Sequence, residues 1–494
     1  MPFGRRVRAT TTRRRPGRFS MLLLALTGVA ATVGYWMWGG SGIARIGQTT
    51  SQPDASGIQN GSAERERSES SSIVPGSPTI AVRNRDWPAL FGPTNDSRVA
   101  GPETNLELDW SDEGPPAKWR KPVGTGYSSP IVCDGKLILL SRIGDEEILE
   151  CRNAETGESL WEFRGPTTFQ NGYDRYSSGP YSTPVADGER VYAVGAEGRF
   201  HCVDLQSGEP LWSRFLTEEY DVPEGAWPVS GSPLLEGDLL IVNLGGRDQG
   251  AGILALKKVT GETAWTATDH GAGLATPRAA EIHGSRYVFV LTLDGLVCLS
   301  PATGDVHWIE EFGANHPEKI NSTSPLIWGD RVLISAFAKG SLCLRVLPDG
   351  GREKVWETRR ELQVQYSPLI GWDGYVYAFH SRNKTLRCVD LRDGEIQWEW
   401  PEPGQDGVSR GTAIAIGDRL VLLGEYGYLA ALDANPKAPV LRSLTAQPVL
   451  KPDCFSSPAL ANGLMYLRNE QEVVCFDLRA EQGASAASAA DSDR

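Results

Sequence analysis

The sequence predicts an all-β protein, an eight-bladed β-propeller of four-stranded antiparallel blades. A phrase of Ser or Thr followed by Pro recurs along the chain, and its spacing of 43 to 54 residues is that of a propeller blade. Each copy carries short apolar runs divided by Gly-containing turns, which is typical of antiparallel sheets. One such sheet cannot bury both of its faces, so the copies must pack against one another. The eight copies are anchored at Pro130, Pro184, Pro233, Pro277, Pro325, Pro368, Ala413 and Pro458.

The four strands of a blade are clearest in the sixth copy. They read "SPLIGW", "YVYAFH", "LRCVDL" and "IQWEW", separated by the turns "DG", "SRNK" and "RDGE". The third strand often carries a Cys, at Cys151, Cys202, Cys298, Cys343, Cys388 and Cys475. Equivalent positions in different blades lie far apart, so we interpret these Cys as small buried apolar residues. A bridge between Cys133 and Cys454 is left open.

The fourth strand carries a Trp in six copies, is degenerate near Arg442 in the seventh, and is missing from the eighth. An unassigned strand with Trp119, "AKWRKPVG", precedes the first anchor. We therefore expect this N-terminal strand to complete the last blade and close the ring. Each indole is predicted to pack structurally against the neighbouring blade near its Gly turn. These residues are Trp119, Trp161, Trp212, Trp265, Trp308, Trp356 and Trp398.

The segments outside the repeats differ in composition. Residues 1–18 hold seven Arg and no acid, and residues 19–40 form an uncharged apolar run with three aromatic residues near its end. This pattern predicts a basic cytoplasmic segment followed by a transmembrane signal anchor, with a cleaved signal peptide as the alternative. Residues 41–85 are predicted to be a flexible linker, 86–480 the propeller and 481–494 a disordered tail.

The net charge indicates which partners to expect. The chain carries −13 overall, and near −20 once the N-terminal Arg residues are set aside. This acidic balance argues against binding to nucleic acid or to anionic lipid headgroups. We expect contact with the membrane through the N-terminal helix only.

The repeat "CVDLRDGEIQW" resembles that of the quinoprotein propellers, the pyrroloquinoline quinone (PQQ)-like repeat family. The Thr-Gly-Trp part of that repeat is matched at Thr156–Gly157–Trp161, and the segment "DWPALFGP" resembles the entry segment of exported members. The resemblance implies one of two roles, catalytic or non-catalytic. Some members are PQQ- and Ca²⁺-dependent dehydrogenases, and others are non-catalytic, like the BamB-type scaffold of outer-membrane assembly.

Sequence motifs for chemistry are sparse. The chain has no adjacent Cys pair, no C-x-x-C-H haem motif and no H-E-x-x-H motif, and its six His are scattered. The long links after Trp161 and Trp212 instead gather aromatic and charged residues, which are typical of binding loops. The candidate partner-binding rim is Tyr173, Asp174, Arg175, Tyr176, Tyr220, Asp221 and Trp227. The alternative is that these loops only pack on their own blades.

We predict a membrane-tethered, outward-facing, non-catalytic scaffold that binds a protein partner on its long-loop face and holds no cofactor. Its location would be the bacterial inner membrane, as a single-pass protein with the propeller on the periplasmic side, or the exported soluble state. One alternative is a PQQ/Ca²⁺-dependent dehydrogenase of alcohols or sugars. A second is a propeller that senses a small ligand in its channel.

Overall fold

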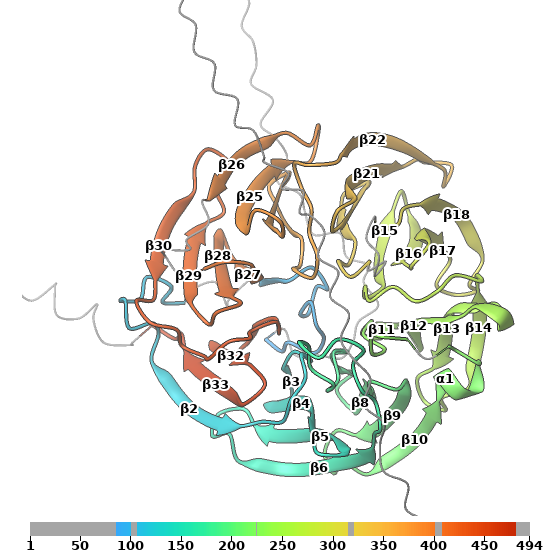
Figure 1. Ribbon diagram of the computed structural model, residues 1–494, viewed down its shortest axis with the longest axis horizontal. Helices are drawn as coiled ribbons and strands as arrows, with labels where there is room; N and C mark the ends of the chain where they lie inside the picture. Colours follow the sequence, from blue (N-terminus) through green and yellow to red (C-terminus); the bar gives the residue numbers. More distant parts are fainter. Residues whose placement is uncertain (1–84, 100–105, 224, 315–320, 401–407, 481–494) are drawn as a thin grey trace, which may run out of the picture. The chain divides into compact units, whose positions relative to one another are not determined.

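The computed structural model describes residues 85–99, 106–223, 225–314, 321–400 and 408–480. All of them belong to the second of two compact units, Ile73–Arg494. Eight antiparallel sheets surround a common centre (Figure 1), which confirms the predicted eight-bladed propeller. The described residues contain almost no helix.

The strands of each blade follow one another along the chain, from the centre of the ring outward. In the first four blades they are β3 (Ile131–Cys133), β4 (Lys136–Ile143), β5 (Glu146–Asn153) and β6 (Ser159–Pro166); β7 (Val185–Ala186), β8 (Arg190–Val194), β9 (Arg199–Asp204) and β10 (Pro210–Phe215); β11 (Leu234–Glu236), β12 (Leu239–Gly246), β13 (Ala251–Lys257) and β14 (Thr263–Ala267); β15 (Arg278–Ile282), β16 (Ser285–Leu291), β17 (Gly295–Leu299) and β18 (Val306–Glu311).

The last four blades repeat this order, with two additions from the N-terminal side of the chain. They are β19 (Leu326–Trp328), β20 (Arg331–Ala336), β21 (Gly340–Val346) and β22 (Arg352–Thr358); β23 (Ile370–Trp372), β24 (Tyr375–His380), β25 (Thr385–Asp390) and β26 (Ile396–Trp400); β27 (Gly411–Ile416), β28 (Arg419–Gly424), β29 (Leu429–Asp433) and β30 (Val440–Leu444), with β1 (Arg98–Val99) parallel to β27; and β31 (Ala459–Ala461), β32 (Leu464–Arg468) and β33 (Glu472–Asp477), with β2 (Ala117–Pro122) antiparallel to β33. Helix α1 (Leu216–Glu219) and the 3-10 turn η2 (Arg247–Gln249) lie outside the sheets.

A register shift between the third and fourth strands brings a small residue opposite each Trp. Cys151 pairs with Trp161, Cys298 with Trp308, and Cys475 with Trp119 across the sheet. The Cys thiols are buried, and burial raises the pKa of Cys151 to about 12. The recurring Cys therefore leaves room for the facing indole and stays protonated.

The fourth-strand Trp residues join neighbouring blades. Each indole Nε1 donates to a backbone carbonyl of the next blade at 2.8–3.2 Å, from Trp119, Trp161, Trp212, Trp265, Trp308, Trp356 and Trp398. Except at Trp398, which donates to the Asn435 carbonyl, the next blade presents a glycine to the indole. A Cβ at Gly157 would lie 2.8 Å from the Trp119 ring, and its φ of +70° also favours glycine. Gly and Trp recur together because these indoles, apart from that of Trp398, pack on the glycine turn of the blade that follows.

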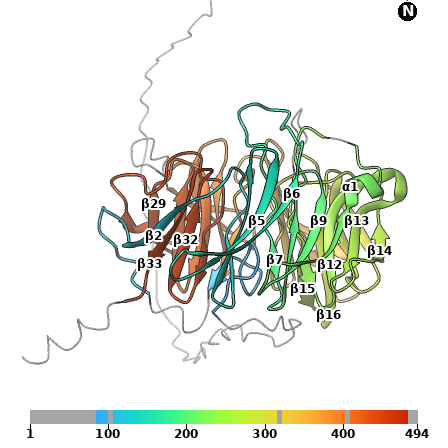
Figure 2. The same ribbon diagram turned by 90° about the horizontal axis from the view of Figure 1, so that it is seen from below.

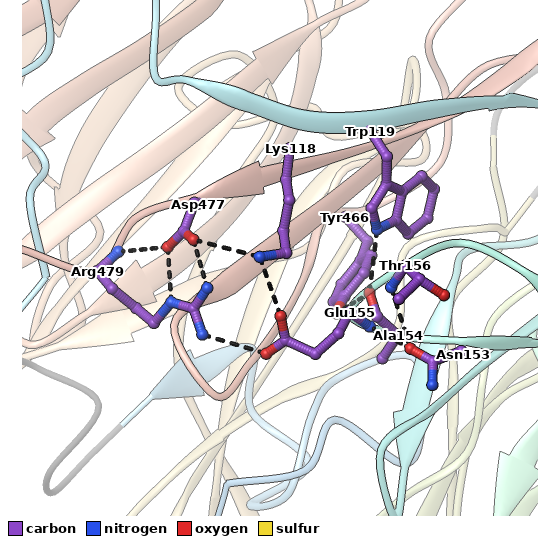
Figure 3. Close-up of polar contacts among 9 residues, drawn as sticks. All are labelled: Lys118, Trp119, Asn153, Ala154, Glu155, Thr156, Tyr466, Asp477 and Arg479. Atoms are coloured by element: carbon purple, nitrogen blue, oxygen red, sulfur yellow. Dashed lines mark hydrogen bonds and ion pairs between the residues drawn. The ribbon is translucent and has the colours of Figure 1, made fainter.

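The joint between the last blade and the first has the same design (Figure 3). Trp119 and Tyr466 both donate to the Ala154 carbonyl, at 3.2 and 3.1 Å. Glu155 forms ion pairs with Lys118 and Arg479, each at 3.1 Å. The N-terminal and C-terminal strands therefore meet in one sheet, which packs on the first blade like any other neighbour.

Blade 7 departs from the repeat. Ser443, opposite Ala431, takes the place of the Trp, and its hydroxyl donates to the carbonyls of Leu108 and Trp110. Trp110 belongs to the apolar cluster that blades 7, 8 and 1 share. An indole from the N-terminal segment thus packs in the region where the repeat lacks one.

The structure also bears on the predicted disulfide bridge and on the predicted terminal segments. The possible Cys133–Cys454 bridge was wrong, since both thiols are free and buried. Cys133 precedes the first turn of blade 1, whereas Cys454 lies in the link before β31, at the opposite end of its blade. The predicted anchor at 19–40 and the tail at 481–494 lie outside the described residues. Within the described part of the chain, no helix is long and apolar enough to cross a membrane.

Candidate functional site

The two faces of the propeller carry different connections. We call the side with the links between blades and the second turn of each blade the link face, and the side with the first and third turns the turn face. The link after β6 and helix α1 lie on the link face, at the top of Figure 2. The inner strands end at both faces, so the central channel has one mouth on each.

Residues 86–99, which we call the N-terminal plug, cover the mouth on the turn face. Trp87 is 1% exposed and exchanges two backbone hydrogen bonds with Val132 of blade 1, at 2.9 and 2.8 Å. At the other end of the plug, β1 pairs with β27 of blade 7. The plug crosses the centre of the ring, where it appears in blue in Figure 1.

Cationic and aromatic side chains fix the middle of the plug. The guanidinium of Arg278, in blade 4, lies 4.3 Å from the centre of the Phe91 ring. Arg98 of the plug lies 4.8 Å from the Trp372 ring and 5.6 Å from the Trp328 ring. These contacts reach blades 4, 5 and 6, and they are the kind of cation–π pairing that is strongest away from water.

Leu90 and Phe91 of the plug also line a central cavity of about 180 Å³. Its wall consists of two rings of side chains that hold fixed places in the repeat. The inner ring is the residue directly before each anchor: Ser129, Thr183, Ser232, Thr276, Ser324, Ser367, Thr412 and Ser457, all of which except Thr412 line the cavity. The outer ring, three residues before each anchor, is Tyr127, Tyr181, Ser230, Leu274, Ser322, Gln365, Arg410 and Phe455.

The inner ring connects the blades. At five of the eight joints the backbone N–H of one member donates to the hydroxyl of the next at 2.8–3.0 Å, as in Ser129 to Thr183 and Thr183 to Ser232. Between blades 6 and 7 and between blades 7 and 8 the hydroxyl is the donor: Ser367 Oγ donates to the Gly411 carbonyl, and Thr412 Oγ1 donates to the Ser456 carbonyl. These hydroxyls satisfy buried backbone groups, so they are structural and not nucleophiles.

The outer ring is aromatic on one side only. Tyr127 contacts Tyr181 and Phe455 with ring centres 4.6 and 4.9 Å apart, and Phe455 meets Tyr366 edge-on at 5.1 Å. The Tyr366 hydroxyl is enclosed and has no hydrogen-bond partner among the described residues. Burial raises the pKa of Tyr366 well above its usual value, so the hydroxyl stays protonated.

The charged side chains near the cavity mostly form ion pairs or hydrogen bonds with one another. Arg410 Nη2 lies 2.7 Å from an oxygen of Glu425, a carboxylate that is 3% exposed and also accepts from Ser409 at 3.0 Å. Burial and the neighbouring Glu425 raise the pKa of Asp453. The one cation of the outer ring is therefore committed to an internal ion pair.

The predicted rim divides into two groups. Tyr173 and Tyr176 pack on Trp227 with ring centres 4.9 and 5.0 Å apart, and Arg175 lies over Tyr176 at 4.8 Å. Asp174 is exposed beside them. The structure thus joins the two long links through Trp227, and we call this set the aromatic rim.

Tyr220 and Asp221 do not belong to the aromatic rim. The Tyr220 hydroxyl lies 2.7 Å from Thr263 Oγ1 of blade 3, and Asp221 accepts from Gln249 at 2.7 Å. These two side chains instead contact blade 3, the blade that follows their link.

A groove of about 620 Å³ runs along the link face beside the aromatic rim. Trp227 lines both this groove and the central cavity. Much of its wall is apolar, with Phe169, Val222 and Leu244 among its residues, and Glu197 and Arg247 supply charge. Its size falls within the range of roughly 300–1,000 Å³ that is usual for ligand clefts, whereas the central cavity is smaller.

Comparison with known proteins places this architecture in a family. A family model for the outer membrane protein assembly factor BamB matches residues 144–400 and 382–486. The chain belongs to the BamB family. BamB of Burkholderia pseudomallei (strain K96243) is 24% identical over 307 residues, which is 59% of this chain and 74% of that protein. BamB of Salmonella typhimurium (strain LT2) is 25% identical over 350 residues, 65% of this chain and 79% of that protein.

Solved structures share the fold at low sequence identity. BamB from Moraxella catarrhalis superposes with a TM-score of 0.54 at 15% identity, over 74% of this chain and all of that one. A quinohemoprotein alcohol dehydrogenase from Comamonas testosteroni gives 0.56 at 13% identity, over 81% of each chain. These similarities show only the propeller fold. Whether the chain resembles BamB or a dehydrogenase in function must be judged from the residues that line the cavity.

The cavity does not fit a Ca²⁺-bound quinone. Ca²⁺ takes six to eight oxygen ligands, usually with several carboxylates among them. Neither ring of the cavity contains an Asp or Glu, and its one cation, Arg410, is paired with Glu425. Among the described residues, no group of three His, Cys, Asp or Glu side chains could hold a metal ion.

The sequence interpretation missed the two rings and the plug. The signal for the rings was present, because the positions one and three residues before each anchor could be read blade by blade. Listed in that way, they give a column of hydroxyls and a column that is aromatic in blades 1, 2 and 8. The plug had no such signal, since "DWPALFGP" occurs once and the plug's partners lie in several different blades.

Proposed function

We propose that the chain is a non-catalytic scaffold of outer-membrane protein assembly that binds a protein partner on its link face. The aromatic rim and the adjoining groove would form the centre of that interface. The observation that carries the proposal is the cluster of Tyr173, Tyr176 and Trp227 at the edge of a largely apolar groove. Aromatic residues with apolar surroundings and a charged border are the usual anchors of protein interfaces.

The opposite face supports the choice of the link face. The turn-face mouth is covered by the chain's own plug, and the turns around it are short. The link face instead carries the links after β6 and β10, which are longer than the others and meet at Trp227. A BamB-like role needs a protein-binding surface, and the link face offers one at the aromatic rim and the adjoining groove.

The interface can be mapped with a photo-crosslinking residue in cells that make the protein. We expect the crosslinker at exposed Asp174 to give one discrete adduct, with a protein of the outer-membrane assembly machinery, identified by mass spectrometry. The matched control is Val259, which is 54% exposed on a turn of blade 3 at the turn face. An adduct of equal yield at both positions, or at Val259 alone, would contradict the proposal.

We also propose that the scaffold faces the periplasm and is tethered by residues 19–40. The support is the order of a basic segment, an apolar run and a spacer ahead of the propeller. Full-length protein should sediment with membranes and resist carbonate extraction, while its propeller is cleaved by protease added to spheroplasts. Release into the soluble periplasmic fraction would instead identify residues 19–40 as a cleaved signal.

A second candidate function is binding of a small neutral ligand in the central cavity. The enclosed, unpartnered hydroxyl of Tyr366 favours it, because a buried donor without a partner is costly. If a ligand supplies that partner, Tyr366→Phe lowers the melting temperature of protein isolated from its own cells. If the cavity holds no ligand, the substitution leaves the melting temperature unchanged or raises it. PQQ with millimolar Ca²⁺ should give no shift in either protein.

A further inference from the structure

A second groove, of about 580 Å³, lies on the link face at blade 6. It is formed by the link after β22, the second turn of blade 6, and strands β25 and β26. Four arginines line it, Arg359, Arg360, Arg382 and Arg387, against one carboxylate, Glu361. On a chain with a net charge of −13 this concentration of cations is unexpected. We call it the arginine groove.

The floor of the arginine groove contains a buried cation with an unused donor. Arg387 is 4% exposed, and its Nη2 lies 2.8 Å from Glu399. Its Nη1 donates to the carbonyls of Arg360, at 3.1 Å, and Glu361. The Nε is enclosed and has no partner among the described residues. A buried guanidinium N–H without an acceptor is costly, and this one belongs to a side chain that lines the groove.

The rim of the arginine groove carries cations that are not neutralised. Arg359 and Arg360 are exposed, and neither guanidinium forms an ion pair within the described residues. Arg382 has one long contact, 3.5 Å to Gln363 Oε1, and lies over the Phe337 ring at 5.6 Å. Elsewhere on the surface Arg164, Arg442 and Arg479 each pair with a carboxylate. The groove therefore gathers several unpaired arginines, in contrast to these three paired ones.

His380 holds the two sides of the groove in place without adding charge. It is 2% exposed, its Nε2 lies 3.0 Å from the Arg360 carbonyl, and its Nδ1 accepts from the Asn383 N–H at 3.1 Å. Burial and the nearby Arg387 lower the pKa of His380 to about 4. The imidazole is thus neutral at pH 7, and it ties the link before blade 6 to the turn that carries Arg382.

We propose that the arginine groove binds a phosphate group, through the rim arginines and the Nε of Arg387. Guanidinium groups offer planar pairs of donors that match phosphate oxygens, and several of them around one cavity suit a dianion better than a single carboxylate. The phosphate belongs either to a soluble phosphate compound or to a lipid headgroup. The overall acidic charge argues against anionic ligands in general, but binding depends on the local field of these four residues.

The test uses the purified full-length protein and two probes. Inorganic pyrophosphate is titrated by calorimetry, and vesicles of phosphatidylglycerol or of phosphatidylcholine are tested by flotation. The double substitution Arg359→Gln/Arg382→Gln removes two exposed rim cations and leaves the buried Arg387 in place. The control, Arg164→Gln, removes an exposed cation from β6, far from the groove in the sequence and in a different blade.

We expect saturable binding of at least one probe that the double variant weakens by about tenfold or more, and that Arg164→Gln changes by less than about twofold. Binding of pyrophosphate with this dependence identifies a soluble phosphate compound as the source. Preferential binding to phosphatidylglycerol vesicles with this dependence, without pyrophosphate binding, identifies a lipid headgroup. The absence of saturable binding to both probes, or equal losses in the two variants, would overturn the proposal.

Discussion

The two mouths of the central channel differ although the same repeat builds both. On the turn face the N-terminal plug seals the mouth, with Trp87 buried and β1 added to blade 7. On the link face the mouth is lined by the aromatic side of the outer ring and bordered by the aromatic rim. The repeat makes the ring, and segments outside the repeat decide which end of it is available for binding.

Substitution of Trp87, which anchors the plug, tests the difference between the two mouths with the largest expected effect. Trp87→Ala should lower the free energy of unfolding by about 3–5 kcal/mol, as expected for loss of a buried aromatic side chain. The control at the open mouth, Trp227→Ala, should cost less than about 1 kcal/mol because Trp227 is only half-buried. Denaturant unfolding of the full-length proteins measures both values. Equal losses would mean that the two mouths are equally packed.

The next largest expected change in the free energy of unfolding comes from a buried carboxylate near the link face. Glu147 is 8% exposed and accepts from the Ala196 N–H at 2.7 Å, and burial raises its pKa to about 7. Because the folded state holds the proton more tightly than the unfolded state, this group lowers stability as the pH rises from about 4.5 to above 7. The accumulated loss is about 3 kcal/mol at most.

Glu147→Gln should therefore flatten that part of the stability profile. Unfolding measured at pH 5 and pH 8 should differ by up to about 3 kcal/mol less in the variant than in the wild type. Glu146→Gln, the same substitution at an exposed neighbouring position, is the control. An unaltered profile in Glu147→Gln would show that Glu147 is ionised in the folded protein at neutral pH.

Substitution in the inner ring should give the smallest of the three losses of stability. Ser232→Ala removes the acceptor of the buried Thr183 N–H, at a cost of about 1–3 kcal/mol. Ser230→Ala, in the outer ring, should change stability by less than about 0.5 kcal/mol. Thermal unfolding of the two variants side by side checks the expected order. A larger loss for Ser230→Ala would contradict the structural role of the inner ring.

The repeat was sufficient to predict the fold, because Gly turns, Trp positions and anchors recur with one spacing. The same reasoning explains why the sequence grouped Tyr220 with Trp227. Both lie in the link after β10, but the course of that link is not periodic, and it turns Tyr220 toward Thr263 of blade 3. The arginine groove was missed for a similar reason, since its residues come from a link, a turn and a strand. Only the folded chain brings them together.

The central claim is that a partner binds at the open mouth and not at the plugged one. The most direct measurement is the affinity of the full-length protein for the partner that crosslinks at position 174, compared between two variants. The account predicts that Tyr173→Ala/Trp227→Ala weakens binding by about tenfold or more, whereas the turn-face variant Gln206→Ala/Val259→Ser changes it by less than about twofold. Unchanged binding in the first variant, or a comparable loss in the second, would contradict the account.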